Sequence, residues 1–334
     1  MKKPFISVII TAYNRREFIR DAVNSVINSA LPENEYEIIV VKNFKDEYVD
    51  SIVEKTGGKS IITDIVSIGA KVALGIEVAS GDVITFLEDD DAYLPSRLGD
   101  VRNMFEHVPS LIYYHNNVVA IDENGKVMLD KLIEETSIHD TVIAYNYEDK
   151  LNAFRRYGWG LGLRLSSMAV RRSFINKWVG IIKRFSDLVD VLIFLLALAS
   201  DGTIYHDPRR LTYYRVSSTS ASSARAVRDP LNRFNRAVKN AARHAIARHM
   251  FVTLAEKLGL RKYVRYDEAT VIGGIYGDWG MWLSKAVVDL VMCGSTRCVG
   301  SAMLGLTYLI SPWLAKRLVY LYYTRVFNAW GLRY

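Results

Sequence analysis

Four consecutive carboxylates, Glu88, Asp89, Asp90 and Asp91, end an apolar run in the stretch DVITFLEDDDAYLP. Adjacent carboxylates repel one another, so an isolated cluster would raise its own pKa values or open into solvent. A divalent cation removes this repulsion, because Mg2+ or Mn2+ prefers carboxylate oxygens and leaves coordination positions for substrate phosphates. A solvated acidic turn after an edge strand is the alternative interpretation. Residues 82–87 predict a buried strand, which favours the metal site.

A second acidic pair, Asp187 and Asp190, stands at the start of the apolar stretch FSDLVDVLIFLLALA. Their spacing predicts that both lie on one face of a helix. A favourable charge at the start of the helix is the alternative role for Asp187. Asp190 lies deeper in the apolar run, where an unpartnered charge is costly. Asp190 therefore needs a partner or a chemical task.

Short β-branched runs alternate with amphipathic helices in the first half of the chain. The predicted strands are residues 5–11, 37–41, 60–63, 82–87 and 111–115. Apolar helical faces fall between them, the first at residues 18–27. This alternation predicts an α/β fold with a doubly wound, mostly parallel open sheet. Such sheets bind ligands at the carboxyl ends of their strands, which is where residues 88–91 fall.

The composition is that of a folded protein with one basic segment. The 334 residues are 50% apolar and 24% charged, and the net charge is +7. These values exclude a disordered chain, and the two cysteines provide no disulfide framework. Eleven lysines and arginines lie between Arg225 and Arg265 against two acids, so the positive charge belongs to this segment. We expect a catalytic domain at 1–222, a basic helical segment at 223–268 and hydrophobic helices at 269–334.

The basic segment and the tail indicate an anionic membrane surface as a partner. A predicted helix beyond Asp229 has an apolar stripe opposite a basic face, which is typical of helices that lie on anionic lipid. The uncharged run from Cys298 to Ala315 is slightly short for a membrane span. We expect residues 279–330 to form one or two helices that enter the bilayer. The alternatives are a surface helix packed on the sheet and a homodimer interface; nucleic acid is not expected, because no reading motif is present.

Four sequence blocks resemble the family-2 glycosyltransferases of GT-A fold. They are SVIITAYNR, EIIVV, GIEVASGDVITFLEDDDAYLP and LTYYRVSSTSAS, and the resemblance covers residues 4–222. Polyprenyl-phosphate mannose synthases share these motifs. The resemblance implies a nucleotide diphosphate sugar as donor, with Mn2+ or Mg2+ as cofactor on its diphosphate. It also implies Asp90 as the metal ligand, with Asp89 reaching the ribose or the metal and Asp91 or Glu88 in support.

The donor site of this family maps onto residues from several strands. The donor-binding residues that the resemblance implies are Thr11, Ala12, Tyr13, Arg15, Lys42, Asn43, Lys71, Asp89 and Arg215. Helix capping is the alternative role for Arg15. Lys42 or Asn43 could contact a guanine or a phosphate, and solvation is the alternative for Lys42. This chain departs from the family after the second strand, where Lys42 and Asn43 replace an Asp that reads the base and the next acid is Asp46. GDP-mannose and UDP-sugars both remain open as donors, and the similarity to mannose synthases favours GDP-mannose.

The resemblance also implies a catalytic base and an acceptor site. An inverting transferase needs a carboxylate that takes the proton of the acceptor hydroxyl. The family places this acid at the start of a helix, before an apolar run, which implies Asp187 first and Asp190 in reserve, whereas a phosphate acceptor would need no strong base. The implied acceptor-site residues are Trp159, Gly160, Ser166 and Ser167. Packing in the core is the alternative role for Trp159.

Together these features predict a membrane-associated inverting glycosyltransferase that moves a hexose, with mannose favoured, to a lipid-linked or polyprenyl-phosphate acceptor. The first apolar run is too short for a signal peptide, so we expect the catalytic domain at the cytoplasmic face of the cell membrane. A sugar nucleotidyltransferase is a second interpretation, although TAYNRREF lacks a glycine-rich phosphate loop. A catalytically silent adaptor for membranes or nucleic acid is a third.

Overall fold

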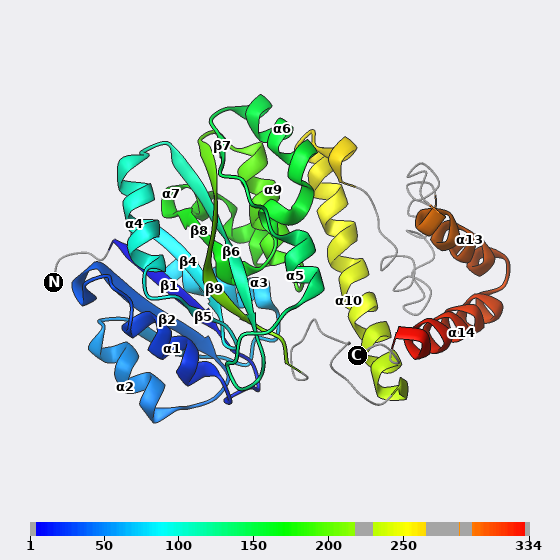
Figure 1. The fold of residues 1–334 in the computed structure, drawn as a ribbon, viewed down its shortest axis with the longest axis horizontal. Helices are drawn as coiled ribbons and strands as arrows, with labels where there is room; N and C mark the ends of the chain where they lie inside the picture. The colour runs from blue at the N-terminus through cyan, green and yellow to red at the C-terminus, as the bar shows by residue number, and fades with distance from the viewer. Residues whose placement is uncertain (1–4, 218–229, 265–286, 288–295, 331–334) are drawn as a thin grey trace. The chain divides into compact units, whose positions relative to one another are not determined.

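The chain divides into two compact units, Met1–Val216 and Ser217–Tyr334. The structure, a computed structural model, describes residues 5–217, 230–264, 287 and 296–330 (Figure 1). The first unit contains the sheet, and helices form the described part of the second. The predicted boundaries at residues 222 and 268 lie outside the described residues.

Strands and helices alternate at the start of the first unit, as the sequence predicted. The elements there are β1 Ile6–Thr11, α1 Ile19–Ile27, β2 Tyr36–Lys42, α2 Glu47–Lys55, β3 Lys59–Ile62, α3 Ile68–Val78 and β4 Val83–Glu88. The remaining elements are β5 Ala92–Tyr93, α4 Arg97–His107, β6 Leu111–Ile121, α5 Lys131–Thr136, β7 Val142–Ala144, α6 Tyr147–Tyr157, η3 Leu165–Ser167, β8 Met168–Arg171, α7 Arg172–Ile175, α8 Val179–Ile182, α9 Val189–Ala199 and β9 Thr203–Arg215.

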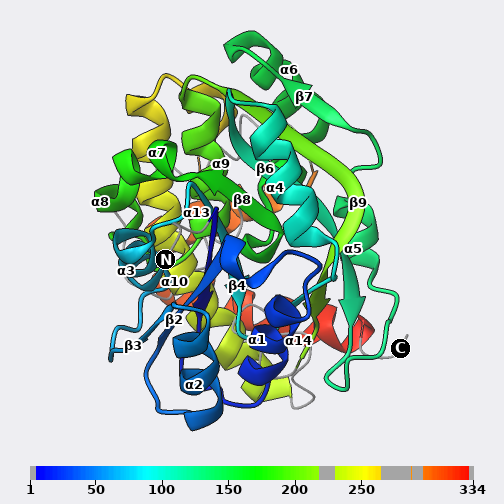
Figure 2. The same ribbon diagram turned by 90° about the vertical axis from the view of Figure 1, so that its left-hand side faces the viewer.

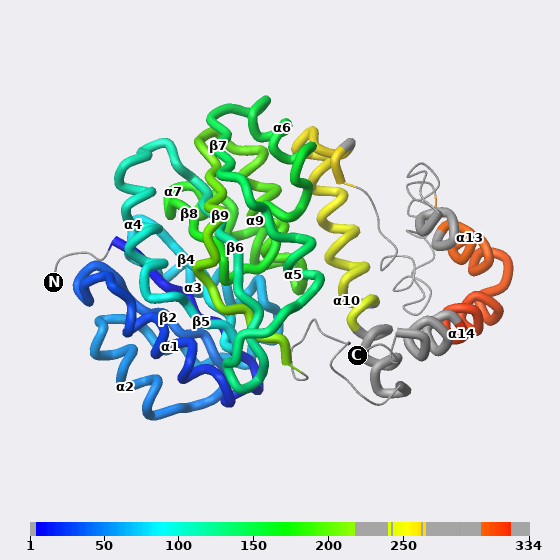
Figure 3. Tube along the Cα trace, viewed as in Figure 1, coloured from blue at the N-terminus to red at the C-terminus, as the bar shows by residue number. Residues whose placement is uncertain are grey.

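The sheet is mixed. Its strand order is β3-β2-β1-β4-β8-β6-β9-β5, with β7 paired to β9, and the chain can be followed from β1 to β9 in Figure 3. Strands β3, β2, β1 and β4 pair in parallel, as predicted. Strand β8 pairs antiparallel with both β4 and β6. Strand β6 pairs in parallel with β9, whereas β5 and β7 pair antiparallel with β9. The sheet is therefore parallel across β1 to β4 and between β6 and β9, as expected, and it is mixed because β8, β5 and β7 run antiparallel to their neighbours.

The two faces of β1 pack against different helices, because successive side chains of a strand point to opposite faces. Ile6, Val8 and Ile10 join a core cluster with residues of α1, α2 and α4. Ile9 faces Gly75 of α3 instead. Helices α3 and α8 accordingly lie on one side of the sheet and α4 on the other (Figure 2). Coverage of both faces explains why β1 and β2 are buried along their whole length.

The second unit contains helices α10 Pro230–Lys257, α13 Thr296–Ile310 and α14 Pro312–Trp330. Helix α10 confirms the helix predicted beyond Asp229, but the side chains of its first residues lie outside the description. Among the described residues, no helix combines the length and the apolar character that a membrane span needs. The predicted entry of the tail into a bilayer stays a prediction.

A close backbone approach holds α3 against the segment that leads into α9. The Gly69 amide donates to the Phe185 carbonyl oxygen at 3.1 Å, and the Ser67 hydroxyl, which caps α3, donates to the same oxygen at 2.9 Å. A Cβ atom on Gly69 would overlap the carbonyl oxygens of Ile182 and Phe185. These oxygens belong to the backbone and cannot rotate away.

We therefore expect Gly69→Ala to lower the free energy of unfolding by about 2 kcal/mol, the usual cost of overpacking. Gly180→Ala is the matched control, because no atom lies within 4 Å of a Cβ atom placed there. Ala is the better helix former, so this change should leave stability equal or raise it by up to about 1 kcal/mol. Urea unfolding followed by circular dichroism measures both, and equal effects would contradict the packing argument.

Candidate functional site

The acidic residues lie where β4 ends beside β1. Glu88 is the last residue of β4 and pairs in register with Thr11, the last residue of β1. Asp89, Asp90 and Asp91 follow in a turn before β5, and all three are buried. The carboxylates therefore gather at the carboxyl ends of the parallel strands, the edge at which such sheets bind ligands.

Arg15 neutralises part of this charge. Its guanidinium pairs with both Asp89 and Asp90, with 2.8 Å between Nη1 and the Asp90 Oδ2 atom. Burial alone would lower the pKa of Arg15, but the hydrogen bond to Asp89 and the charge of Asp90 raise it. Helix α1 begins at Ile19 without a side-chain cap, so Arg15 does not have the alternative capping role. It is the internal counter-ion of the acidic turn.

The cluster nevertheless carries excess negative charge. Burial and the charge of Asp91 raise the pKa of Glu88 well above its usual value. Burial raises the pKa of Asp90 to about 6, although Arg15 acts in the opposite direction. Burial together with the charge of Asp90 raises the pKa of Asp91 to about 8. Without a further cation, part of the cluster therefore holds protons at neutral pH.

One oxygen of Asp91 shows how a cation could fit. Its Oδ1 atom accepts the Arg215 amide at 2.9 Å, whereas Oδ2 is buried with no partner that meets hydrogen-bond geometry. Within the described ranges, no group of three or more His, Cys, Asp or Glu side chains could hold a metal ion by itself. Mg2+ commonly takes one or two protein carboxylates and completes its coordination with substrate phosphates and water. Asp90 and Asp91 therefore fit a cation that binds together with a diphosphate.

The guanidinium of Arg215 is committed within the fold. It donates to the carbonyl oxygens of Asp90 at 2.8 Å and Glu123 at 3.0 Å, and it pairs with Asp21 at 3.1 Å. The residue is only 3% exposed. These contacts attach the end of β9 to the acidic turn. Arg215 thus has a structural role beside the acidic turn, and its contact with the donor stays a prediction.

Lys71 brings α3 to the end of β1. Its ammonium donates to the Ala12 carbonyl oxygen at 3.3 Å and lies 5.0 Å from the centre of the Tyr13 ring. Burial lowers the pKa of Lys71, and the charge of Asp89 acts in the opposite direction. The hydroxyl of Thr11 is buried here without a hydrogen-bond partner. The predicted donor residues of β1 and α3 therefore meet beside the acidic turn.

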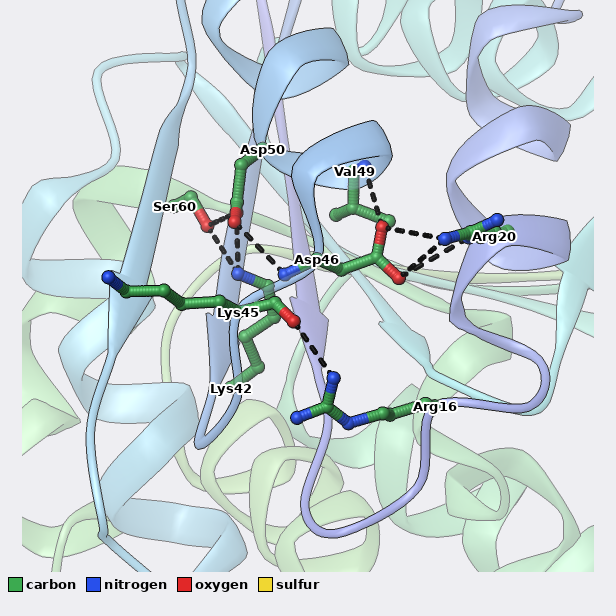
Figure 4. Close-up of polar contacts among 8 residues, drawn as sticks. All are labelled: Arg16, Arg20, Lys42, Lys45, Asp46, Val49, Asp50 and Ser60. Atoms are coloured by element: carbon green, nitrogen blue, oxygen red, sulfur yellow. Dashed lines mark hydrogen bonds and ion pairs between the residues drawn. The ribbon is translucent and has the colours of Figure 1, made fainter.

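Lys42, by contrast, has partners inside its own βα unit (Figure 4). It is buried, and its ammonium contacts the Asp50 carboxylate at 2.5 Å and the Ser60 hydroxyl at 2.8 Å. The alternative of a solvated side chain is therefore wrong. Lys42 has a structural role, and a contact with the donor is not part of the function proposed below.

The other polar residues after β2 divide between structural and site-facing contacts. Asp46 caps α2 by accepting the Val49 amide at 3.1 Å, and it pairs with Arg20 at 3.3 Å (Figure 4). Asn43 accepts the Asn14 amide at 2.8 Å and donates to the Asn14 side chain at 2.6 Å. Asn43 therefore contacts the segment after β1 that carries the predicted donor residues.

One short segment joins Asp190 to the acidic turn. The Asp190 Oδ2 atom accepts the Arg164 amide at 3.0 Å, and two residues later the Ser166 hydroxyl oxygen accepts the Glu88 amide at 2.9 Å. Burial raises the pKa of Asp190, and the charge of Asp190 contributes to the raised pKa of Glu88. The structure therefore brings Ser166 and Asp190 to the site from distant parts of the sequence.

Asp187 lies outside the helix in which it was expected. Helix α9 begins at Val189, after Leu188 in the left-handed region with a φ of 60°. The Asp187 carboxylate accepts the Leu188 amide at 2.9 Å. The two acids consequently do not share a helical face. Asp190 lies in the first turn of α9, and the Arg164–Ser166 segment links it to the acidic turn.

The other predicted acceptor residues, Trp159, Gly160 and Ser167, lie in the two short 3-10 helices at residues 158–162 and 165–167. Trp159 packs edge-on against Phe154 and Phe194, with 4.8 Å and 6.2 Å between ring centres. The Ser167 hydroxyl donates within its own turn at 2.7 Å, and Gly160 lies close to the backbone of α5. Packing is thus the observed role of Trp159, and contact of Gly160 or Ser167 with a sugar stays a prediction.

Arg164 is a residue of the site that the sequence motifs did not indicate. Its backbone has a φ of 68°, its amide holds Asp190, and its guanidinium donates to the Thr136 hydroxyl at 2.7 Å. The available signal was the glycine density of GLGLRLSS, which indicates close packing. A Cβ atom on Gly162 would lie 2.6 Å from Phe194 of α9. Because Gly162 has no side chain, helix α9 can pack closely against this segment. This close packing lets the Arg164 amide reach Asp190.

The raised pKa of Asp91 predicts a pH-dependent stability. Between about pH 4 and its folded pKa of about 8, the folded state binds a proton that the unfolded state has lost, so stability falls as pH rises. Asp91→Asn removes this titration. In metal-free protein we expect it to raise the free energy of unfolding at pH 8.5 by more than about 1.4 kcal/mol, one pKa unit, and by much less at pH 5.

Urea unfolding in a chelating buffer at several pH values measures this effect. The exposed Asp64→Asn is the control, because its carboxylate is outside the cluster. Parallel pH profiles for the two variants would contradict the assignment of the raised pKa to Asp91.

Comparison with known sequences places this site in a family. Residues 7–178 match the model of Glycosyl transferase family 2. An uncharacterised glycosyltransferase of Methanocaldococcus jannaschii is 27% identical over 137 residues, which cover 38% of this chain and 46% of the relative. The glycosyltransferase AglE of Haloferax volcanii is 32% identical over 93 residues, covering 26% of this chain and 31% of AglE. The chain thus spans less than half the length of these relatives.

Solved structures show a similar fold. The crystal structure of residues 1–349 of TarS from S. aureus, in complex with UDP-GlcNAc, has a TM-score of 0.56 and 15% identity over 96% of this chain and 91% of that one. This likeness supports a GT-A-like α/β fold with a mixed sheet. Because the family match covers residues 7–178 of 334, half of the sequence, this chain belongs to glycosyltransferase family 2.

Proposed function

We propose that this protein transfers a sugar from a nucleotide diphosphate sugar to an acceptor hydroxyl, with inversion at the anomeric carbon. The observation that carries the proposal is the buried acidic turn at the end of β4, joined to Asp190 by the hydrogen bonds of Arg164 and Ser166. This arrangement brings a site for a diphosphate and its cation next to a carboxylate that could accept a proton. Family membership supports the same reaction class.

Asp90 and Asp91 would hold Mn2+ or Mg2+ in this reaction. When bound, such a cation neutralises the negative charge that develops on the departing diphosphate. The remaining donor contacts fall to Thr11, Ala12 and Tyr13 at the end of β1. These residues are buried or half-buried beside Lys71 and the acidic turn.

Asp190 is the proposed base in place of Asp187. Burial raises the pKa of Asp190 toward the operating pH, which is what a general base requires. Its Oδ1 and Oδ2 atoms accept the amides of Val191 and Arg164, so the carboxylate is held in one orientation. Asp187 precedes the helix, and its carboxylate accepts the amide of the adjacent Leu188.

We favour a UDP-sugar over GDP-mannose as the donor. TarS, the structural neighbour, was solved with UDP and with UDP-GlcNAc. Lys42, one of the two residues after β2 that could contact a guanine or a phosphate, is instead paired with Asp50. Asn43, in contact with Asn14, offers amide groups that can hydrogen-bond either base.

We further propose that the acceptor is lipid-linked and that the second unit binds a membrane surface at the cytoplasmic face. Exposed apolar side chains on α13 and α14 support this. They are Met303, Leu306, Leu309, Ile310, Trp313, Leu314 and Leu318. An apolar face of this kind suits a helix that lies in the interface without crossing the bilayer.

Donor identity is tested by calorimetric titration of UDP and GDP with Mn2+, followed by transfer assays with labelled sugars and a lipid extract. We expect UDP to bind, and Asp90→Ala to reduce transfer about 100-fold. Asp190→Asn should still bind UDP but transfer at least about 100-fold more slowly, whereas Asp187→Asn should retain most activity. Binding of neither nucleotide would favour a silent adaptor, and binding of GDP alone would restore GDP-mannose.

Membrane binding is tested by sedimentation with vesicles of phosphatidylglycerol and phosphatidylcholine. Ile310 and Trp313 are 87% and 66% exposed, so the double change of both to Lys should reduce binding at least about tenfold. Ile62→Lys, an exposed position in the first unit, is the control. Undiminished sedimentation of the double variant would exclude this face as the membrane contact.

A further inference from the structure

Arg15 holds the carboxylates that a cation would need. Its Nη2 and Nη1 atoms contact Asp89 and Asp90 respectively, so one guanidinium bridges neighbouring acids. Asp91 Oδ2, by contrast, is buried beside them without a hydrogen-bond partner. A cation that binds both carboxylates would therefore find the Asp91 Oδ2 atom without a partner but the Asp90 Oδ2 atom paired with Arg15.

Two other cations near the turn, Arg215 and Lys71, already have partners in the fold. Arg215 is only 3% exposed, and carbonyl oxygens and the Asp21 carboxylate hold its guanidinium. The ammonium of Lys71 donates to the Ala12 carbonyl oxygen. The Arg15 side chain is 19% exposed and comes from the short connection between β1 and α1, so it can swing with little disturbance of the sheet.

We propose that Arg15 is a positioning residue that exchanges Asp90 for the donor diphosphate and thereby makes cation and nucleotide binding mutually dependent. Before the donor arrives, the guanidinium keeps Asp89 and Asp90 partnered and competes with the cation. The diphosphate offers Arg15 a second anion with which it can form paired hydrogen bonds. Its departure frees the Asp90 carboxylate for the cation. This inference rests on the proposed donor site.

The exchange is a coupling between two ligands, so it is reciprocal: nucleotide must strengthen cation binding by the same factor as cation strengthens nucleotide binding. Removal of Arg15 removes the competitor. The cation alone should then bind more tightly, while the extra gain from nucleotide should shrink. A merely structural arginine would weaken both ligands without changing this factor.

The experiment titrates Mn2+ into the full chain by calorimetry, with and without saturating UDP. In the wild type we expect UDP to lower the Kd of Mn2+ at least about tenfold. In Arg15→Met, Mn2+ alone should bind about tenfold more tightly than to the wild type, and UDP should change this Kd less than about threefold. Arg16→Met is the matched control, because Arg16 contacts Lys45 and Phe44 and should keep the wild-type coupling.

Arg15→Gln provides a second variant, and thermal unfolding verifies that each protein is folded. Mn2+ should raise the unfolding temperature of both Arg15 variants more than that of the wild type, because their acidic turn lacks its counter-ion. Wild-type coupling retained in both Arg15 variants would overturn the exchange while leaving the donor site intact. Failure of the wild type to bind Mn2+, UDP and GDP would overturn the proposed function and the exchange together.

Discussion

The burial of adjacent carboxylates in one turn is the constraint on which the rest of the first unit depends. A buried charge without a partner is unfavourable, so a turn with three buried aspartates needs several cationic or hydrogen-bonding partners. Arg15 reaches the turn from the segment after β1, and Arg215 reaches it from the last residue of β9. The first and last strands of the unit are therefore attached to the same few residues.

The same constraint extends to the start of α9. The segment that runs through Arg164 and Ser166 contacts both Asp190 and Glu88, the residue at which the acidic cluster begins. At the other end of the helix, Lys150 donates to the carbonyl oxygens of Ala197 at 3.0 Å and Ser200 at 2.5 Å. Interactions at both ends thus fix the position of α9. A carboxylate on its first turn is held in place before any substrate arrives, which favours catalysis.

Arg15 and Arg215 carry the same guanidinium group but differ in how deeply it is buried. Arg15 and Arg215 both touch the acidic turn, yet the guanidinium of Arg15 contacts side-chain carboxylates, whereas that of Arg215 mainly contacts backbone carbonyls. The arginine with carboxylate partners is also the more exposed one. A ligand with its own negative charge can compete for Arg15, but it cannot reach the buried guanidinium of Arg215.

The sequence by itself determined the four neighbouring parallel strands β1 to β4 and the place of the acids at their carboxyl ends. Short β-branched apolar runs and the apolar faces of helices encode β1 to β4 locally, and Glu88 to Asp91 follow the last of these strands whatever the remaining chain does. The antiparallel entry of β8 was decided only by tertiary structure, because a four-residue strand takes its partners from the long-range packing around it. Tertiary structure also decided the partners of Lys42, Arg215 and Asp190. Each side chain is chemically able to bind a ligand, and only the fold determines which protein groups it contacts instead.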